Sequence, residues 1–528
     1  MKAQRGFVGL AAGFAAALVL ARLPILLTSL EVRKGAEELL VGVLPFHLMQ
    51  GLILPVLQYQ QEAYAGGTVA TGLVVYPFFR LLGPTYLALK LAVLLFAVVA
   101  GLLYLAAVRG LAGTRAAALF AALYAIAPPL LQQHQVIAYG NHAELNVFLA
   151  AGLLLVLALY RSGGGVALGA ALGVLSGFAL FFDYAYAVFL AVLAGAWVLW
   201  RGARARTLTG FAPAAAVGLL PWFLFHHGWN VAAELGGMFV GRRYGWGKPI
   251  PGVGAWATIV DGFGGGGTTP LAAGWTAATY LAVAAALCVA GLVWERRVRA
   301  RGDAADAKRA ARGRIFLVLL AYVFLYVVVE EVHRLSLPDR SFRARYMVAA
   351  WPSLLVVLDL ALDRLWTERR ALAVLALAAL LVPCAVEGKR LTGKAAARDL
   401  IVAPGYDYYY FTEVLGGRLG VPNDGVKAVR GELRTVLGGP ADVLDEGLLA
   451  GAGHALGFGQ GGRTARYCAD AAACDPRFAV AAGAGAEIAR GNRRHSFRGC
   501  PAPVPEEPCR RGRELAAAAL AAARERKP

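Results

Sequence analysis

Long apolar runs recur along this chain, and they constrain its fold more than any other feature of the sequence. Each run is about 20 residues long, enough for a helix to cross the hydrocarbon core of a bilayer. Because lipid offers the backbone no hydrogen-bond partner, a helix, which pairs its own backbone groups, is the expected conformation. Eleven runs have this character, at roughly 7–29, 84–108, 115–131, 144–160, 165–182, 184–200, 207–227, 271–294, 314–332, 346–363 and 370–386. The fifth and sixth of these runs could instead form one helical hairpin with its turn at "FFDYAY".

The composition supports the same fold class, an all-α polytopic membrane protein with about eleven transmembrane helices. Hydrophobic residues make up 59% of the 528 positions, and the mean hydropathy is +0.58, above that of soluble globular chains. Lys2 and Arg5 precede the first run, as basic residues do in a signal peptide. That run is too long for a signal peptide and has no convincing cleavage site, so we expect it to stay as a membrane helix.

The net charge of +19 could indicate a nucleic-acid partner, but its distribution favours a membrane explanation. Much of the basic excess lies in every second connection between the runs, and these short connections would share one side of the membrane. This is the positive-inside pattern. The pattern places the N-terminus in the cytoplasm, and eleven crossings then place the C-terminus outside. We therefore expect a multi-pass protein of the inner (plasma) membrane that contacts lipids and no nucleic acid. The basic residues concerned are Lys2, Arg5, Arg109, Arg115, Arg161, "RGARAR" at 201–206, the segment 295–314 and "DRLWTERR" at 363–370.

The connections between the runs are unequal in length. The one long inner connection, 295–313, is basic and is expected to face lipid headgroups. Of the two long outer connections, 228–270 has the composition of a loop, whereas 30–83 is half apolar. Within it, the segment 39–57 carries Pro45 and Pro55 and is predicted to form broken helices in the membrane interface.

The chain changes character near residue 387, where apolar runs shorten and charge and glycine increase. This predicts two domains: a transmembrane domain over 1–386 and a small, mostly helical extracytoplasmic domain over 387–528. Two disulfides are expected among the four cysteines of the second domain, although the sequence does not determine which cysteines pair. A metal site is the alternative. Those cysteines are Cys468, Cys474, Cys500 and Cys509, whereas Cys288 and Cys384 lie in apolar runs and are expected to be packing residues.

Ionisable and polar residues gather near the outer ends of the runs. A charge held close to lipid is costly and is usually retained for a role. Their one-sided placement therefore indicates a reaction centre that opens outward. The residues are Glu37, Glu38, His134, Tyr139, Asn141, His142, Glu144, Asp183, His226, His227, Arg242, Arg243, Lys248 and Arg345.

Each of these signals also has a structural explanation. Glu37 and Glu38 could simply neutralise Arg33 and Lys34 at the membrane interface. His142 and Glu144 could cap and solvate the start of the fourth membrane helix. The pair Arg242 and Arg243 could bind lipid headgroups.

Three stretches resemble the GT-C glycosyltransferases, which include dolichyl-phosphate-mannose protein mannosyltransferases and bacterial lipid A aminoarabinose transferases. "AEELLVG" is similar to the Asp-Glu segment that opens their first outer loop, although both acidic residues here are Glu. "YAGGTVATGLVVYPFFRLLGPTYLALKLAVLLFAVVAGLLYLAAVRGLAG" is similar to the stretch that runs into their second helix. "FRARYMVAAWPSLLVV" resembles their late Arg-Tyr segment. The resemblance covers roughly 7–365 and rests on pattern and order, and the tail 387–528 matches no family that we can name.

The resemblance implies a hexosyl or pentosyl transferase that moves a sugar from a polyprenyl-phosphate donor to a lipid, glycan or protein acceptor on the outer face, with inversion. Glu37 then matches the general base, and Glu38 would orient it or bind a cation. The segment 39–57 would line the groove for the polyprenyl chain. Departing phosphate would meet Arg242, Arg243, Lys248 or Arg345, and the acceptor would meet Tyr139, Asn141, His142 and Glu144. If a divalent metal ion takes part, its ligands would be Glu37, Glu38 and His142.

Two other functions fit the helices and basic loops. A transporter or flippase of lipid-linked glycans predicts ionisable groups inside the helices near mid-membrane, for which Asp183 is the nearest candidate. A structural membrane protein whose tail binds a partner predicts no focused acidic and basic cluster outside. The run "GGGG" at 264–267 follows no predicted strand and lacks the Lys-Ser/Thr of a phosphate-binding loop.

Overall fold

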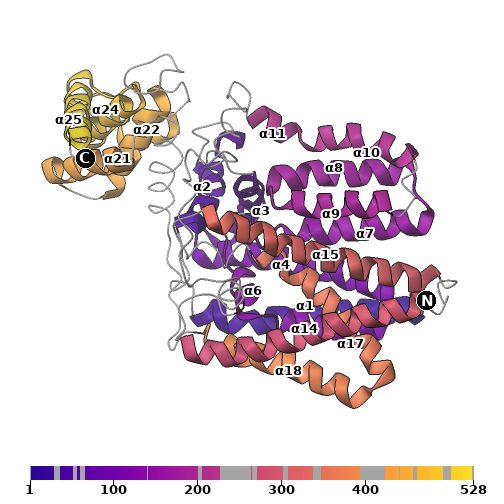
Figure 1. The fold of residues 1–528 in the computed structure, drawn as a ribbon. Coiled ribbons are helices and arrows are strands. Elements are labelled where there is room, and N and C mark those ends of the chain that lie inside the picture. Colours follow the sequence, from indigo (N-terminus) through magenta and orange to yellow (C-terminus); the bar gives the residue numbers. More distant parts are fainter. Residues whose placement is uncertain are drawn as a thin grey trace. The chain divides into compact units, whose positions relative to one another are not determined.

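The part of the chain that the structure, a computed structural model, describes is helical (Figure 1). The structure describes residues 2–28, 36–50, 56–59, 66–138, 141–199, 205–225, 263, 270–300, 307–336, 347–392, 423–438, 441–455, 461–490 and 501–525. Among these residues the only β-structure is bridge pairing, such as the isolated bridge between Cys468 and Cys474, so the predicted all-α class is confirmed. Contacts divide the chain into a first unit of Met1–Arg33, Ala65–Gly67 and Lys90–Arg398, and a second unit of Lys34–Tyr64, Thr68–Leu89 and Asp399–Pro528.

Every one of the eleven apolar runs coincides with helical structure. The helices are α1 Lys2–Thr28, α4 Tyr86–Ala112, α5 Thr114–Ala125, α7 Asn146–Ser162, α8 Val166–Phe182, α9 Tyr186–Leu199, α10 Ala205–Gly218, α11 Leu220–Phe225, α14 Pro270–Ala300, α15 Ala307–Ser336, α17 Trp351–Glu368 and α18 Arg370–Lys389. Within the described ranges, six stretches are long and apolar enough to cross a membrane: Gly6–Thr28, Tyr86–Ala112, Ala205–Leu224, Trp275–Val298, Ala311–Val329 and Arg370–Lys389. The chain is therefore a multi-pass membrane protein, whereas eleven crossings remain a prediction.

Prolines shorten one of the predicted helices. The run 115–131 continues past the end of α5, whose last residue is Ala125. Pro128 and Pro129 follow, and proline lacks the backbone N–H that continues a helix. A separate short helix, α6 Pro129–His134, begins there with proline in its first turn, where no donor is needed.

The fifth and sixth runs form a helical hairpin, as the sequence allowed. Helix α8 ends at Asp183, whose backbone is extended. The Oδ1 atom of Asp183 accepts a hydrogen bond from the N–H of Ala185 at 2.8 Å, just before α9 begins. The carboxylate thus satisfies a backbone donor that the new helix would otherwise leave without a partner.

Glycines bring the backbones of α8 and α10 together. A Cβ atom on Gly173 would lie 2.3 Å from the carbonyl oxygen of Phe211, and one on Gly177 would lie 2.2 Å from that of Ala215. Helices in lipid often associate through small residues in this way, because close backbones increase van der Waals contact.

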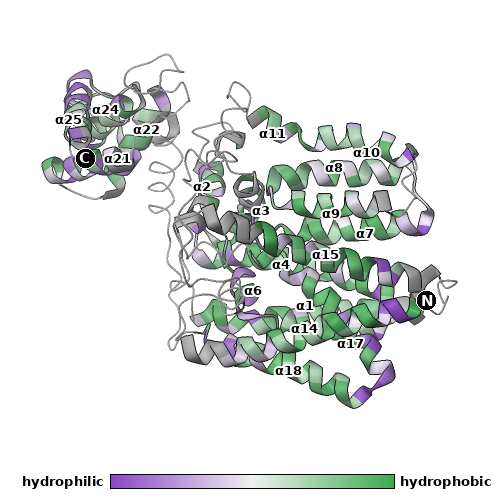
Figure 2. Ribbon diagram, viewed as in Figure 1, coloured by the Kyte–Doolittle hydropathy of each residue, from purple (hydrophilic) through white to green (hydrophobic). Residues whose placement is uncertain are grey.

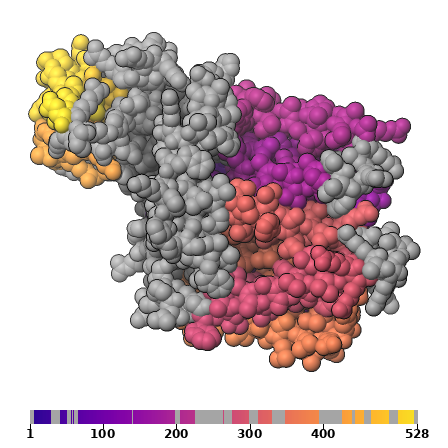
Figure 3. Space-filling view, viewed as in Figure 1, coloured from indigo at the N-terminus to yellow at the C-terminus, as the bar shows by residue number. Residues whose placement is uncertain are grey.

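Large apolar side chains cover the outside of the first unit. Hydrophobic residues run along its helices, and hydrophilic residues concentrate toward the helix ends (Figure 2). Helices α10, α14, α15 and α18 form much of the face seen in the space-filling view (Figure 3). On these helices Trp275, Phe324 and Leu375 are 79%, 70% and 64% exposed, which suits contact with lipid and would be unfavourable in water.

Two ion pairs of a buried aspartate join the ends of three helices, which the basic loops precede or follow. The carboxylate of Asp363, on α17, accepts hydrogen bonds from Arg115 Nε at 2.7 Å and from Arg312 Nη1 at 2.9 Å. These arginines stand at the start of α5 and near the start of α15. The loops that the charge pattern assigned to one side therefore meet at one end of the unit.

In the second unit, helix α2 Ala36–Gln50 runs through Pro45, so the predicted break there is wrong. Proline at 45 leaves the carbonyl of Val41 without its helical donor. Gly72, on α3 Gly67–Leu82, packs against that carbonyl, since a Cβ atom there would lie 3.1 Å from Val41 O. The close approach of α3 shields the freed carbonyl from lipid. A 3₁₀ turn, η1 Val56–Tyr59, follows α2 in the same unit.

The C-terminal part of the second unit is helical, as predicted. Its elements are α21 Asn423–Leu437, α22 Ala441–Ala455, α23 Gly461–Tyr467, α24 Pro476–Arg490 and α25 Glu506–Glu525. Small residues let these helices touch: a Cβ atom on Gly451 would meet the carbonyl of Ala482, and one on Gly483 that of Cys509.

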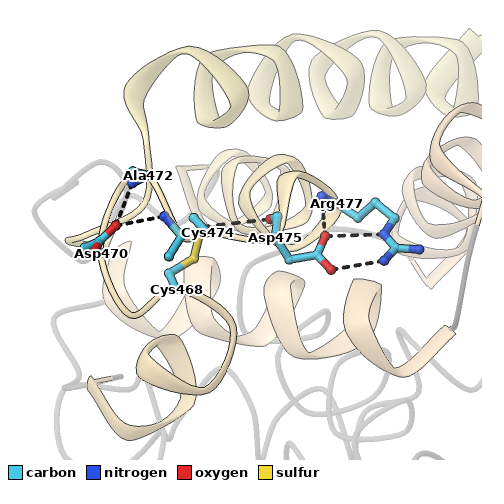
Figure 4. Close-up of a disulfide and its surroundings, with 7 residues drawn as sticks. Cys468, Asp470, Ala472, Cys474, Asp475 and Arg477 are labelled. Carbon is cyan, nitrogen blue, oxygen red and sulfur yellow. Dashed lines mark hydrogen bonds and ion pairs between the residues drawn. A yellow bond between two sulfur atoms is a disulfide. The ribbon is translucent and has the colours of Figure 1, made fainter.

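The cysteines follow the predicted division of roles. Cys468 and Cys474 form a disulfide (Figure 4), and Cys509 is disulfide-bonded as well. Cys500 lies outside the described residues, so its pairing with Cys509 stays a prediction. Cys288 and Cys384 are free thiols within α14 and α18. The domain boundary at residue 387 also stays a prediction.

Candidate functional site

The segment from α6 to the start of α7 carries an unusual concentration of buried polar side chains. Each of them is at most 7% exposed. Polar groups at such depth are expensive, which makes the segment a candidate site. The residues, with two neighbours from α4 and the α8–α9 turn, are Lys90, Gln132, His134, Gln135, His142, Glu144, Asn146 and Asp183.

A histidine and a carboxylate face each other at the centre of this set. His142 Nδ1 lies 3.4 Å from Asp183 Oδ2, and both side chains are buried. A carboxylate in this position orients the ring and favours the tautomer that carries a proton on Nδ1.

Neighbouring helices hold the backbone of the segment in place. Lys90, at the start of α4, donates from Nζ to the carbonyl of Val136 at 3.4 Å. Asn146, at the start of α7, donates from Nδ2 to the carbonyls of Ala143 at 3.1 Å and Val348 at 3.4 Å. Val348 belongs to a 3₁₀ turn, η3 Met347–Ala349, that precedes α17. Two other parts of the chain, α4 and η3, thus fix the candidate site.

The simple capping explanation of His142 and Glu144 does not agree with the structure. The N-cap residue of α7 is Leu145, and it makes no side-chain capping hydrogen bond. Glu144 is fully buried, and His142 faces Asp183. Both polar side chains are therefore held inside the protein for another reason.

Sequence reasoning missed Arg22. This residue of α1 is fully buried and donates from Nε to Gln135 Oε1 at 2.7 Å and from Nη1 to Gln132 Oε1 at 3.4 Å. Gln132 in turn donates to the carbonyls of Ala127 at 2.7 Å and Cys384 at 3.1 Å. The network ties α6 to α1 and α18. An arginine inside an otherwise apolar run was the signal that could have found it.

The acidic pair belongs to the second unit. Glu37 and Glu38 both lie on α2, and Glu38 is fully buried. The side chain of Glu37 lies outside the described residues. Farther along α2, His47 Nδ1 lies 3.0 Å from the hydroxyl of Tyr59, and both residues are buried.

The remaining predicted residues are only partly covered. Asn141 is half-buried, and its carbonyl accepts the N–H of Leu145 at 2.9 Å. Tyr139, His226, His227, Arg242, Arg243, Lys248 and Arg345 lie outside the described residues. Within the part that is described, no group of three or more His, Cys, Asp and Glu residues could hold a metal ion. The metal set of Glu37, Glu38 and His142 includes an undescribed side chain and stays a prediction.

The helices and their apolar surfaces define a polytopic membrane protein of the all-α class. The sequence matches no family model and no curated protein. Among solved structures, the chain is similar to ArnT from Cupriavidus metallidurans in the apo state, with 16% identity, 98% of this chain and 78% of that chain covered, and a TM-score of 0.48.

The chain is also similar to the oligosaccharyltransferase of Archaeoglobus fulgidus. For its apo form the identity is 14%, the alignment covers 83% of this chain and 59% of that chain, and the TM-score is 0.43. For the same enzyme, AglB, in complex with an inhibitory peptide and a dolichol-phosphate, the identity is 14% and the TM-score is 0.41. That alignment covers 82% of this chain and 59% of that chain. The chain thus spans less than two thirds of the oligosaccharyltransferase chains. At these identities the likeness concerns the fold alone.

Proposed function

We propose that this protein is an integral membrane glycosyltransferase. It transfers a hexosyl or pentosyl group from a polyprenyl-phosphate donor to an acceptor on the outer face of the membrane, with inversion. The observation that carries the proposal is the buried pair of His142 and Asp183 next to the fully buried Glu144, in a segment that α4 and η3 hold in place. The sequence resemblance supplies the reaction class.

The reaction needs one base and a cationic environment. The acceptor hydroxyl oxygen attacks the anomeric carbon, the bond from that carbon to the phosphate oxygen breaks, and the hydroxyl proton passes to a carboxylate. We assign this carboxylate to Glu37. Arg242, Arg243, Lys248 and Arg345 supply the charge that stabilises the departing lipid phosphate.

We assign the acceptor end of the reaction to the α6–α7 segment. His142, oriented by Asp183, presents Nε2 to the acceptor, and Glu144, Asn141 and Tyr139 complete its contacts. Such groups increase the rate by holding the hydroxyl close to the anomeric carbon.

The proposed orientation has the N-terminus in the cytoplasm and the C-terminal region 387–528 outside. The disulfide between Cys468 and Cys474 supports this assignment, because disulfides persist in oxidising compartments. The enzyme would then work at the outer face of the plasma membrane.

A transfer assay tests the proposal directly. Purified protein in proteoliposomes receives a polyprenyl-phosphate sugar with a radiolabel in the sugar and a lipid extract of the host envelope as acceptor. We expect label to move to a new lipid or glycan product, and a mass-spectrometric comparison of envelope glycans with and without the gene to name that product. Label that stays on the donor, with envelope glycans unchanged by loss of the gene, would contradict the proposal.

One observation favours a second function, the transport of lipid-linked glycans. Asp359 is fully buried at the middle of α17, and Arg22 is fully buried in α1, as a transporter with ionisable groups inside its helices predicts. The same proteoliposomes distinguish the two functions. A transporter would move the labelled donor across the bilayer intact, without forming a product.

A further inference from the structure

A cavity of about 110 Å³ lies at one end of the helices of the first unit, and the α6–α7 segment lies at the other end. It is formed by the C-terminal part of α14, the N-terminal part of α15 and the C-terminal part of α17. Its polar lining residues are Glu295, Arg312 and Arg364, and its aromatic ones are Trp294 and Phe316. Both signs of charge and a large apolar surface therefore meet in one small volume.

The two arginines that line this cavity are held in different ways. Arg312 is fixed, because it donates from Nη1 to Asp363 at 2.9 Å and from Nη2 to the carbonyl of Leu360 at 2.5 Å. Arg364 bonds through Nε to Glu368 at 2.8 Å, and both of these side chains are about two-fifths exposed. An exposed pair of this kind contributes little stability, so the guanidinium of Arg364 can turn toward a bound anion at small cost.

The carboxylate of the cavity has a defined position. Gly313, next to Arg312, has no side chain, and a Cβ atom there would lie 1.9 Å from Glu295 Oε2. Glu295 therefore lies against the backbone of α15, close to the cationic side of the cavity. On the apolar side, the ring of Phe316 packs over Gly291, where a Cβ atom would lie 2.3 Å from it. The two glycines shape both halves of the cavity.

We propose that this cavity binds the headgroup of a phosphatidylethanolamine molecule. The phosphate would take hydrogen bonds from Arg364 and Arg312, and the ammonium group, two carbons away, would donate to Glu295. Trp294 and Phe316 would contact the glycerol and the first acyl carbons, which is the depth at which tryptophan is enriched in membrane proteins. Phosphatidylglycerol lacks the ammonium group, and the trimethylammonium of phosphatidylcholine has no N–H to donate, so Glu295 makes the site selective. Basic pockets between membrane helices bind lipid phosphates in general, and the carboxylate is what distinguishes this one.

Native mass spectrometry of the full-length protein in detergent tests the proposal. The protein is titrated with phosphatidylethanolamine, phosphatidylglycerol and phosphatidylcholine of identical acyl chains. We expect the wild type to bind the first lipid most tightly. Arg364→Gln should weaken binding of all three lipids about fivefold, the effect of one arginine near a lipid phosphate, because each of them carries the phosphate. Glu295→Gln should abolish the preference for phosphatidylethanolamine over phosphatidylglycerol.

The matched control is Arg369→Gln, which removes an exposed arginine from the end of the same helix without touching the cavity. Arg312 is left unchanged because it also holds Asp363. Equal affinity of the wild type for all three lipids would overturn the proposal, as would a preference that survives Glu295→Gln. An effect of Arg369→Gln as large as that of Arg364→Gln would indicate diffuse surface charge instead. Competition by soluble phosphoethanolamine as strong as that by the lipid would show a metabolite site and overturn the lipid assignment.

Discussion

The imidazole of His142 and the carboxylate of Asp183 face each other at 3.4 Å, and the other oxygen of the same carboxylate accepts the first N–H of the α9 turn from Ala185. One side chain thus sets the start of a helix and orients a histidine from a different part of the chain. Both contacts depend on the tight turn between α8 and α9, so the hairpin itself builds the candidate site.

The two roles of Asp183 can be separated by Asp183→Asn. The amide oxygen still accepts the N–H of Ala185, but the negative charge beside His142 is lost. We expect the rate of sugar transfer to fall about 10- to 100-fold, because a neighbouring charge no longer orients the histidine, with little change in thermal stability. The control is Asp470→Asn in an exposed turn, where the carboxylate accepts the N–H of Ala472 at 2.8 Å. Equal rates for Asp183→Asn and the wild type would contradict the assignment.

The acidic pair on α2 gives a second prediction. Neighbouring residues of a helix point about 100° apart, so one carboxylate of the pair faces away from the other. Glu38 is fully buried, and from the family resemblance we expect Glu37 to be the base. Glu37→Gln should slow transfer of a radiolabelled sugar about 10²–10⁴-fold. Near-normal turnover in Glu37→Gln with collapse in Glu38→Gln would reverse the two roles, and near-normal turnover in both would end the hypothesis.

The orientation in the membrane is a third prediction. Alkaline phosphatase fused after residue 400 should be active, because that part of the chain is expected outside. Fusion within 300–310 should be inactive, because this basic loop is expected in the cytoplasm. The reverse result, activity only at the inner loop, would invert the topology and the face on which transfer occurs.

The disulfides make a fourth prediction. In unreduced, denatured protein only Cys288 and Cys384 should react with an alkylating reagent, which peptide mass spectrometry can determine. Replacing Cys468 and Cys474 by serine should lower the free energy of unfolding of the C-terminal helices by about 2 kcal/mol, because the closed loop is short. Alkylation of Cys500 and Cys509 before reduction would rule out the second bridge.

A fifth prediction concerns acid. Asp475 precedes α24 and accepts hydrogen bonds from the backbone N–H of Arg477 at 2.8 Å and from its guanidinium at 3.1 Å (Figure 4). Partial burial alone would raise the pKa of this carboxyl group, but the bonds and charge of Arg477 outweigh it, so the pKa is lowered. A group with a lowered pKa in the folded protein stabilises it above its unfolded pKa of about 4, and the stabilisation is lost as pH falls through the folded pKa.

Hydrogen exchange of the first turn of α24 measures this effect. Protection should be constant near neutral pH and should fall in the acid range below about pH 4. Asp475→Asn keeps a capping oxygen without the charge, so its protection should not depend on pH in that range. Equal pH dependence in the variant and the wild type would assign the acid sensitivity to other groups.

Several features of the fold were predictable because they depend on neighbours in sequence. The length and apolarity of each run determine a helix, since a backbone in lipid must satisfy its own hydrogen bonds. The stop before Pro128 follows from a missing N–H, and the turn at Asp183 follows from a polar residue between two apolar runs. The sequence predicted that Cys468 forms a disulfide but not which cysteine is its partner, because spacing does not determine connectivity.

The sequence by itself determined the class of protein and the helices, and it directed attention to His142 and Glu144. Only the tertiary structure decided that α2 continues through Pro45, because the shield of its freed carbonyl comes from Gly72 on another helix. Likewise, only packing between distant segments brings Asp183 to His142 and Arg22 to Gln135. Helix formation depends on residues three or four positions apart, whereas a buried polar site depends on which helices meet and at what depth, and no local pattern encodes that.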